Sequence, residues 1–244
     1  MNGKKVFTMI CNIKIKENES KENVSLKIKE KLKKNKVVVV KNGKKNIEFW
    51  DSCAKILGKL APMEEDSIGN KTTSFYTDIK HPWHIESNSF SHSNTRQPLH
   101  TDGSYESNSP DIVFFHCEES CDFGGYTIFV SLNQLKKTLK FYKKDLYEKI
   151  TKKNITHQKG NDKKTMPIIS GNKINWNFYR CEECDIRSDF HDFLENYIVN
   201  AGIFKKVKLK KGDAIFFKDQ EILHGRTSFL GNRWLIKGGI YEGF

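Results

Sequence analysis

The sequence predicts a mainly β fold, a barrel or a sandwich, with helices flanking it. Two observations lead to this prediction. The second half of the chain contains short β-branched and aromatic runs separated by turns such as Gly124-Gly125 and Gly212-Asp213. The first half contains amphipathic helical patterns around one short, wholly β-branched run. With 244 residues and 37% hydrophobic content, the chain can bury a substantial core, and we expect a single domain over residues 1–244.

Residues 1–60 are expected to form strands and helices that pack on this core. Val6 to Ile15 has a strand pattern. Ser20 is a candidate N-cap for a helix ending near Lys34, with Val24, Ile28 and Leu32 on one face. Val37–Val40 predicts a buried strand, and Phe49 to Leu60 predicts a helix.

Residues 62–110 are rich in Ser, Asn, Thr and His and show little periodicity, so they are expected to be mostly loop. A long loop in a compact protein is usually either functional or mobile, and we assign this region to the active site. Residues 111–244 are expected to form the β core with helical insertions. The predicted strands are Ile112–His116, Tyr126–Val130, Ile174–Phe178, Val207–Leu209, Ala214–Phe217 and Trp234–Tyr241, and the predicted helices are Leu132–Ile150 and Phe190–Val199.

The net charge of +12 is concentrated at the N-terminus. Residues 1–45 contain 14 Lys and four Glu, whereas the rest of the chain is almost neutral. This region could bind nucleic acid, but its lysines alternate with apolar residues and lack interleaved aromatics, so a solvated helix face is favoured. Lysines also far outnumber the five arginines, which lowers the expectation of a nucleic-acid partner further.

No apolar run is long enough for a membrane helix, and the N-terminus has too short an apolar stretch for a signal peptide. Six cysteines are too few for a disulfide scaffold. We therefore expect a cytoplasmic protein with no membrane partner. The oligomeric state does not follow from the sequence.

His100-Thr101-Asp102 carries the main chemical signal. On an extended chain, His100 and Asp102 point to the same face and offer an imidazole and a carboxylate. A third ligand must come from elsewhere, and His224 in Ile222-Leu223-His224-Gly225-Arg226 is the best candidate. Two histidines and one carboxylate leave open coordination positions, an arrangement typical of non-haem Fe(II) oxygenases. The motif alone is weak evidence, since His224 could equally be a hydrogen-bonded turn residue.

The surroundings make the signal specific. Leu99–Tyr105 is followed by Gly124–Phe129, then by Gly212–Phe217, by Asp219-Gln220-Glu221, by His224–Phe229, and by Gly231–Leu235. In this order and spacing, residues 24–242 resemble the TauD/TfdA-like family of Fe(II)/2-oxoglutarate-dependent dioxygenases, with similarity to its γ-butyrobetaine hydroxylase and clavaminate synthase branches.

The resemblance implies a double-stranded β-helix, or jelly-roll, core of the cupin type. It implies that His100, Asp102 and His224 hold Fe(II), which is chelated by the cosubstrate 2-oxoglutarate and reacts with O2. It also implies that Arg233 clamps the far carboxylate of 2-oxoglutarate, helped by Thr127. A planar guanidinium suits a carboxylate. Arg226 is the alternative clamp.

The resemblance further implies hydroxylation of a C–H bond with release of succinate and CO2. Asp102 disfavours halogenation, because halogenases of this superfamily lack the carboxylate ligand. Desaturation and cyclisation remain open, as does a non-catalytic metal-binding module. An oxygenase recruited to a macromolecule by the Lys-rich region is a further alternative. A zinc hydrolase is the weakest, because no HExxH pattern is present.

Substrate contacts are harder to assign. The candidates are Arg180, Tyr105, Asn88 and Trp83, with Tyr76, His84 and Ser87 as further ones, and ordinary loop packing is the alternative for each. Arg180 is expected to end a strand near the active site. If it faces the metal, the substrate would carry a carboxylate, phosphate or sulfonate, as an amino-acid-like or other small polar molecule does.

The cysteines suggest one more site. Cys117, Cys121, Cys181 and Cys184 have spacings compatible with a four-thiolate structural zinc site. The alternative is two separate pairs of reduced thiols on loops that do not meet.

Overall fold

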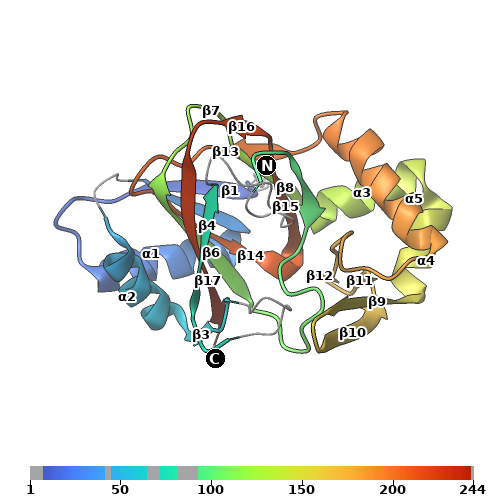
Figure 1. The fold of residues 1–244 in the computed structure, drawn as a ribbon, viewed down its shortest axis with the longest axis horizontal. Helices are drawn as coiled ribbons and strands as arrows, with labels where there is room; N and C mark the ends of the chain where they lie inside the picture. Colours follow the sequence, from blue (N-terminus) through green and yellow to red (C-terminus); the bar gives the residue numbers. More distant parts are fainter. Residues whose placement is uncertain (1–7, 42–44, 65–71, 82–92, 243–244) are drawn as a thin grey trace, which may run out of the picture.

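The computed structural model describes residues 8–41, 45–64, 72–81 and 93–242. Its centre is a pair of packed β-sheets with helices on the outer side of each (Figure 1). The larger sheet has the order β1-β2-β14-β6-β17-β3, and β4 also pairs with β17. These strands are β1 (Ile10–Lys14), β2 (Val37–Lys41), β14 (Ala214–Lys218), β6 (Ile112–Glu119), β17 (Arg233–Tyr241), β3 (Lys59–Ala61) and β4 (Tyr76–His81).

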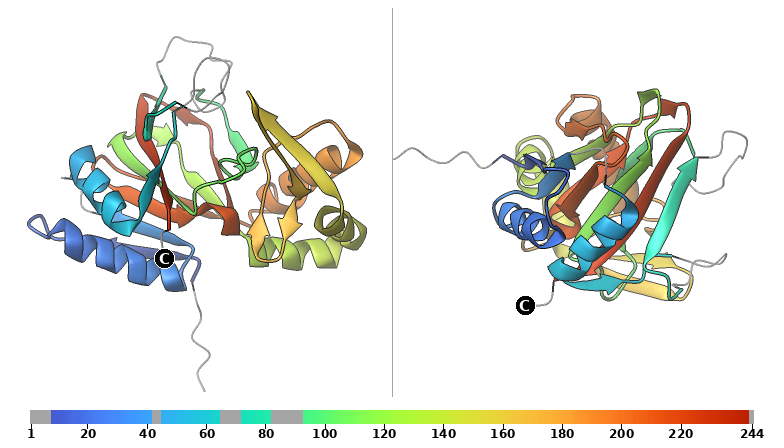
Figure 2. Two further views of the ribbon diagram at one scale, coloured as in Figure 1. Left: turned by 90° about the horizontal axis from the view of Figure 1, so that it is seen from below. Right: turned by 90° about the vertical axis from the view of Figure 1, so that its left-hand side faces the viewer.

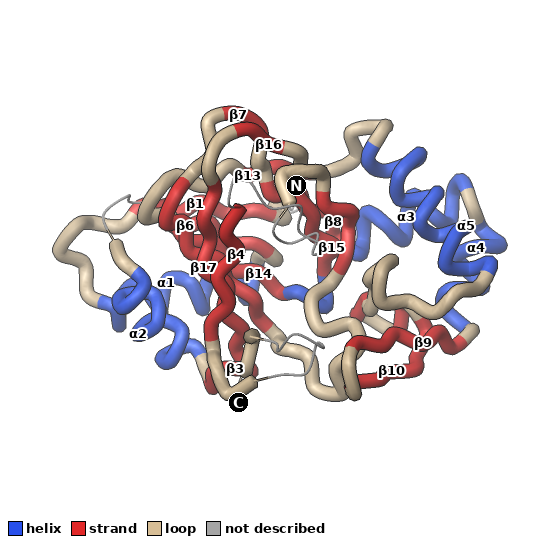
Figure 3. The backbone as a smooth tube through the Cα atoms, viewed as in Figure 1, coloured by secondary structure: helices blue, strands red, loops and turns tan. Residues whose placement is uncertain are grey.

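The smaller sheet has the order β13-β8-β15-β5 and consists of β13 (Lys205–Val207), β8 (Thr127–Ser131), β15 (Ile222–Arg226) and β5 (Gln97–His100). Three two-stranded ribbons complete the strands, as the tube in Figure 3 makes visible. They are β9 (Asn154–Lys159) with β10 (Asp162–Pro167), β11 (Ile169–Ser170) with β12 (Lys173–Ile174), and β7 (Phe123–Gly124) with β16 (Phe229–Leu230).

The helices cover the two outer faces (Figure 2). Helices α1 (Lys21–Lys34) and α2 (Ile47–Leu57) pack on the large sheet. On the small sheet lie α3 (Leu132–Tyr142), α4 (Lys144–Lys152), α5 (Asp185–Phe193) and the π-helix Leu194–Val199. A short 3-10 helix, Asp219–Glu221, joins β14 to β15.

Strand β2 explains why a run of four valines is needed. Val37 and Val39 point between the two sheets, whereas Val38 and Val40 point toward α1 and α2. All four valines are fully buried because both faces of this strand are covered. The continuous apolar run of this strand therefore reflects its position inside a layered structure.

Local signals set the ends of several helices. The Ser20 hydroxyl accepts a hydrogen bond from the backbone N–H of Asn23, which caps α1 as predicted. Asn46 caps α2 in the same way, through the N–H of Phe49. Gly124, the last residue of β7, and Gly125, which follows it, both have positive φ. A Cβ on Gly124 would lie 2.0 Å from the carbonyl oxygen of Ser228. The Gly-Gly turn is therefore required by conformation and by space.

The structure confirms the mainly β fold with flanking helices and corrects several elements. The predicted loop over residues 62–110 contains β4 and β5. The predicted helix Leu132–Ile150 is two helices, and the predicted helix Phe190–Val199 begins earlier, at Asp185, and ends as a π-helix. The predicted strand Ile174–Phe178 is wrong beyond Ile174, because the backbone N–H of Trp176 bonds to the hydroxyl of Thr101 instead of to a neighbouring strand.

In the described part of the chain, no helix is both long enough and apolar enough to cross a membrane.

Candidate active site

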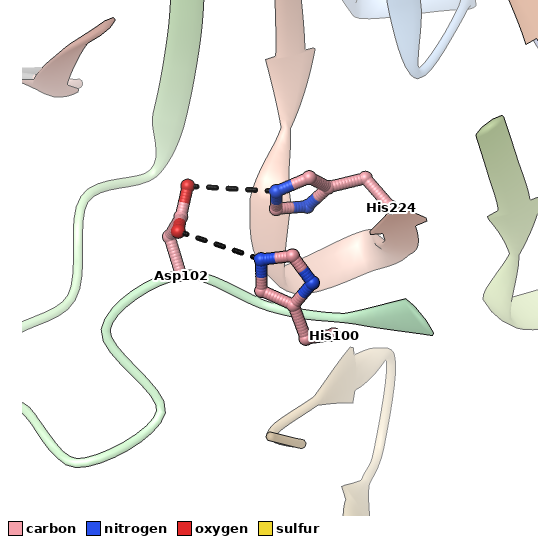
Figure 4. A group of neighbouring side chains, drawn as sticks. All are labelled: His100, Asp102 and His224. Carbon is pink, nitrogen blue, oxygen red and sulfur yellow. Dashed lines mark ion pairs between the residues drawn. The ribbon is translucent and has the colours of Figure 1, made fainter. Parts of the chain in front are cut away.

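His100, Asp102 and His224 meet between the two sheets (Figure 4). His100 ends β5, Asp102 lies in the turn that follows, and His224 lies on the neighbouring strand β15, directly opposite His100. One potential ligand atom from each residue lies within 4.8 Å of the others. Among the described residues, no other group of three or more His, Cys, Asp or Glu side chains meets this criterion.

Strand packing brings the two histidines together. Gly225 follows His224, and a Cβ at this position would lie 2.7 Å from the carbonyl oxygen of Gln97. The missing side chain lets β15 approach β5, so that the His100 and His224 rings have centroids 4.3 Å apart. The turn that carries Asp102 is fixed through Thr101, whose backbone N–H donates to the carbonyl of Trp176 at 2.7 Å.

The three side chains have the protonation states that a divalent metal requires. Burial lowers the pKa of both His100 and His224 to about 4, so both imidazoles are neutral at pH 7. Burial alone would raise the pKa of Asp102, but the Lys237 ammonium beside it holds the pKa below its usual range. Neutral imidazole nitrogens and an ionised carboxylate are suitable ligands for Fe(II).

Unsatisfied atoms also fit a bound cation. The Asp102 Oδ2 atom is buried and makes no hydrogen bond in the described structure. It lies 3.6 Å from His224 Nε2, while Asp102 Oδ1 lies 3.9 Å from His100 Nε2. The two histidine Nε2 atoms and the Asp102 carboxylate thus lie close together without forming hydrogen bonds to one another. A metal ion bound between them would satisfy all three groups.

A small pocket, partly open to solvent, has a lining that includes Thr127 and Arg233. Across β8 and β15, Phe129 pairs with His224 and Thr127 pairs with Arg226. Paired residues and residues two apart on a strand point to the same face, so Thr127 shares the face of His224. Arg233 begins β17 on the facing sheet. Both residues are buried.

Arg226 and Arg233 have different surroundings. The Arg226 guanidinium donates to the backbone carbonyls of Ser93 and Thr95, the latter at 2.9 Å, and so holds the segment that leads into β5. Burial and the positive charge of Arg233 lower the pKa of Arg226 to about 9. The Arg233 side chain instead lines the pocket beside Cys117 and Cys121, and burial lowers its pKa as well.

The proposed substrate residues are only partly brought to the site. Tyr105 is buried close to Asp102 and Arg180, since both affect its pKa, which burial raises above the usual range. Arg180 is half-buried in a turn, not at the end of a strand as predicted. Asn88 and Trp83, like His84 and Ser87, lie outside the described residues, and Tyr76 points away, packed on Phe114 in the core under α2.

The four-cysteine zinc site is wrong. Cys117 belongs to the core between the sheets, whereas Cys181 belongs to the core under the outer helices. In the described chain, all six cysteines are free, and the four that were expected to bind zinc do not converge.

Three functional candidates were missed in the sequence. The Lys237 ammonium lies 2.9 Å from Asp102 Oδ1. The alternation of β17 could have found it, because Arg233, Leu235 and Lys237 share a face. Lys159, on the β9–β10 hairpin, lies 5.6 Å from the Tyr105 ring. Asp219 is completely buried behind His224.

Comparison with known proteins identifies the family. Residues 8–174 match the sequence profile of the taurine catabolism dioxygenase TauD, TfdA family. The chain belongs to this family. It is a non-haem Fe(II)- and 2-oxoglutarate-dependent oxygenase, as the resemblance implied. No curated protein sequence matches the chain.

Solved structures of this oxygenase class share the fold. PvcB from Pseudomonas aeruginosa superposes with a TM-score of 0.70 at 16% identity, covering 95% of this chain and 86% of PvcB. An asparagine oxygenase bound to Fe(II), 3-hydroxyasparagine and succinate gives a TM-score of 0.70 at 12% identity, over 90% and 78% of the two chains. The oxygenase OrfP, bound to iron and α-ketoglutaric acid, gives 0.67 at 13% identity, over 91% and 80%. The jelly-roll core is therefore confirmed.

Proposed function

We propose that this enzyme hydroxylates an unactivated C–H bond of a small, anionic or amino-acid-like molecule and releases succinate and CO2. The observation that carries the proposal is the convergence of two neutral imidazoles and one ionised carboxylate between the sheets. In this proposal His100 and His224 bind Fe(II) through their Nε2 atoms, and Asp102 binds it through its carboxylate.

Arg233 and Thr127 are proposed to bind the far carboxylate of 2-oxoglutarate. Both line the same pocket, and both sit on strands whose inner faces meet there. The Arg226 guanidinium already donates to two backbone carbonyls, which leaves fewer of its N–H groups for a ligand. These contacts support Arg233 over Arg226 as the carboxylate clamp.

The substrate is proposed to bind on the side of the cluster formed by Tyr105, Arg180, Lys159 and Lys237. Burial, together with the positive charges of Arg180 and Lys237, lowers the pKa of Lys159 to about 8. Three cations near one another favour an anionic group on the substrate. Two of the solved structures that share the fold contain hydroxylated asparagine or hydroxylated arginine, which supports an amino-acid-like substrate.

The chain's own residues would orient the reaction. Bound Fe(II) supplies the redox chemistry that couples O2 reduction to decarboxylation of 2-oxoglutarate and oxidation of the substrate. Arg233 fixes one end of the cosubstrate by a charge-assisted hydrogen bond, and the cations opposite fix the acidic group of the substrate. The surrounding aromatic side chains, Phe115 and Phe217 among them, pack against His224 and exclude water from the reacting centre.

The first experiment is an anaerobic titration of the protein with Fe(II) and 2-oxoglutarate, followed by the visible charge-transfer absorption of the chelate. We expect the band in the wild-type protein and its loss in His224→Ala. Release of succinate is then screened with L-amino acids and other small carboxylates, phosphates and sulfonates. A folded wild-type protein without the band contradicts the proposed triad. A band without succinate release from any compound favours a non-catalytic binding module.

A further inference from the structure

Asp219 is a buried carboxylate next to the metal cluster that the proposed reaction does not use. It begins the 3-10 helix between β14 and β15, five residues before His224, and its side chain is completely inaccessible to solvent. Burial and the nearby charge of Asp102 raise the pKa of Asp219 well above its usual value, so the ionised carboxylate needs a specific partner that stabilises it. A buried Asp at this place therefore requires an explanation.

The partner is the far side of the His224 ring. Asp219 Oδ1 lies 3.2 Å from His224 Nδ1, while His224 Nε2 faces Asp102 on the opposite side of the ring. In the described structure His224 Nδ1 has no other hydrogen-bond partner, while the Asp219 carboxylate also accepts a hydrogen bond from the backbone N–H of Asp102. The His224 imidazole therefore lies between two carboxylates, those of Asp102 and Asp219.

His100 provides an internal comparison. Its Nδ1 atom lies 2.9 Å from the backbone carbonyl oxygen of Pro98, and its Nε2 atom faces Asp102. A carbonyl can only accept a hydrogen bond, so the His100 Nδ1 atom carries the proton and Nε2 is unprotonated, with the Gln97 side-chain amide 3.4 Å away as a donor. Both rings therefore present Nε2 to the centre and Nδ1 to an oxygen, one a backbone carbonyl and the other the Asp219 carboxylate.

We propose that Asp219 is a positioning residue for His224. Its carboxylate accepts the hydrogen bond of His224 Nδ1–H, which fixes the ring orientation and leaves Nε2 unprotonated toward the metal. Such outer carboxylates orient metal-bound histidines and make them stronger ligands. The inference rests on the proposed role of His224 as a metal ligand, and it explains why an ionisable side chain is buried at this turn.

The first test needs no variant and no metal. Nitrogen NMR of the metal-free protein, labelled with ¹⁵N-histidine, distinguishes the Nδ1–H from the Nε2–H form of a neutral ring. We expect Nδ1–H for both His100 and His224 in the wild-type protein. An Nε2–H form of His224 would overturn the proposal.

The second test is Asp219→Asn, which keeps the shape of the side chain and removes its charge. We expect the affinity for Co(II), followed by its visible absorption, to fall by about 10- to 100-fold, the usual effect of losing such a partner. Glu221→Gln is the matched control, since Glu221 lies on the same short helix and pairs outward with Lys36 and Lys218. Its Co(II) affinity should equal that of the wild type.

The outcomes separate this inference from the proposed function. If the wild type and Glu221→Gln bind Co(II) and folded Asp219→Asn binds it equally well, Asp219 does not position His224. If His224→Ala also retains wild-type affinity, the proposed triad itself is wrong. If Asp219→Asn does not fold, the tautomer of His224 in the wild-type protein decides the question.

Discussion

On one side of the His100–Asp102–His224 cluster the proposed binding residues lie on strands, whereas on the other side they lie on turns. On the first side, Thr127 and Arg233 belong to β8 and β17, which lie in facing sheets and whose inner side chains form the pocket. On the second side, Arg180 lies in a turn and Lys159 at the end of the β9–β10 hairpin. The ladder of hydrogen bonds fixes the first side, so its side chains have defined positions.

The difference suggests that the strand side binds the cosubstrate and the turn side binds the substrate. A cosubstrate that is the same throughout the family can be held by the strands that make the fold. A substrate that differs between members is better held by turns and hairpins, which can change without disturbing the sheets. The following predictions test this comparison between the strand side and the turn side.

The largest effect should come from the cluster that both sides share. Replacing His100 with Ala removes a proposed ligand and should lower turnover at least about 1,000-fold, equivalent to about 4 kcal/mol of activation free energy. Succinate release with saturating Fe(II) measures it. His191→Ala is the control. His191 lies on the outer helix α5, where its ring stacks on Phe178, so the substitution should leave the rate nearly unchanged. Full activity of His100→Ala would exclude the proposed triad.

On the strand side, Arg233→Gln should weaken 2-oxoglutarate binding by about 10- to 150-fold, since a hydrogen bond between charged groups contributes about 1.5–3 kcal/mol. The anaerobic charge-transfer titration gives the dissociation constant directly. Arg226→Gln should instead lower the melting temperature, because it releases the backbone carbonyls of Ser93 and Thr95. The reverse pattern, with the larger loss of affinity in Arg226→Gln, would assign the clamp to Arg226.

On the turn side, Arg180→Ala should raise the KM of the substrate by up to about fivefold, the effect of one partly exposed charged contact of up to about 1 kcal/mol. Lys159→Ala should act in the same direction. Neither substitution should change the dissociation constant of 2-oxoglutarate, because neither residue lines the pocket of Arg233. An unchanged substrate KM in both variants would remove the anionic subsite from the proposal.

The same comparison explains what the sequence could predict. His100, Asp102, His224, Thr127 and Arg233 could be predicted because they occupy strands, or positions directly after strands, in a recurring order of motifs. Lys237 lies on a predicted strand two inward positions after Arg233, and no motif of the sequence marks it as part of the site. The pairing of β15 with β5 also depends on Gly225, whose close approach to Gln97 only the folded chain reveals.

The turn side could not be predicted in the same way. Residues 174–178 were predicted to form a strand, but tertiary hydrogen bonds decide the conformation of the residues after Ile174. Asn175 Nδ2 lies 3.3 Å from His157 Nδ1, and Trp176 bonds to Thr101. These partners are 18 and 75 residues away in the sequence. Spacing likewise suggested a zinc site for Cys117, Cys121, Cys181 and Cys184, but the fold places Cys117 in the core between the sheets and Cys181 and Cys184 in the core under the outer helices.

The smallest expected effect concerns His157, which is buried on the β9–β10 hairpin. Burial lowers its pKa from 6.5 to about 4, so the unfolded chain binds more protons than the folded protein between these pH values. The free energy of unfolding of the metal-free protein should therefore fall as the pH decreases from about 6.5 to about 4, with up to about 1.4 kcal/mol per pH unit from this one histidine.

His157→Gln isolates that contribution, because all other histidines are the same in the variant and the wild type. The difference between the two pH dependences therefore comes from His157. Denaturant unfolding at several pH values should give a shallower slope for the variant than for the wild type. The hairpin would then depend on a neutral buried imidazole, in addition to the strand pairing that holds β9 to β10. Parallel curves for the two proteins would mean that His157 titrates equally in the folded and unfolded states, and that the hairpin opens enough at mildly acidic pH to admit a proton.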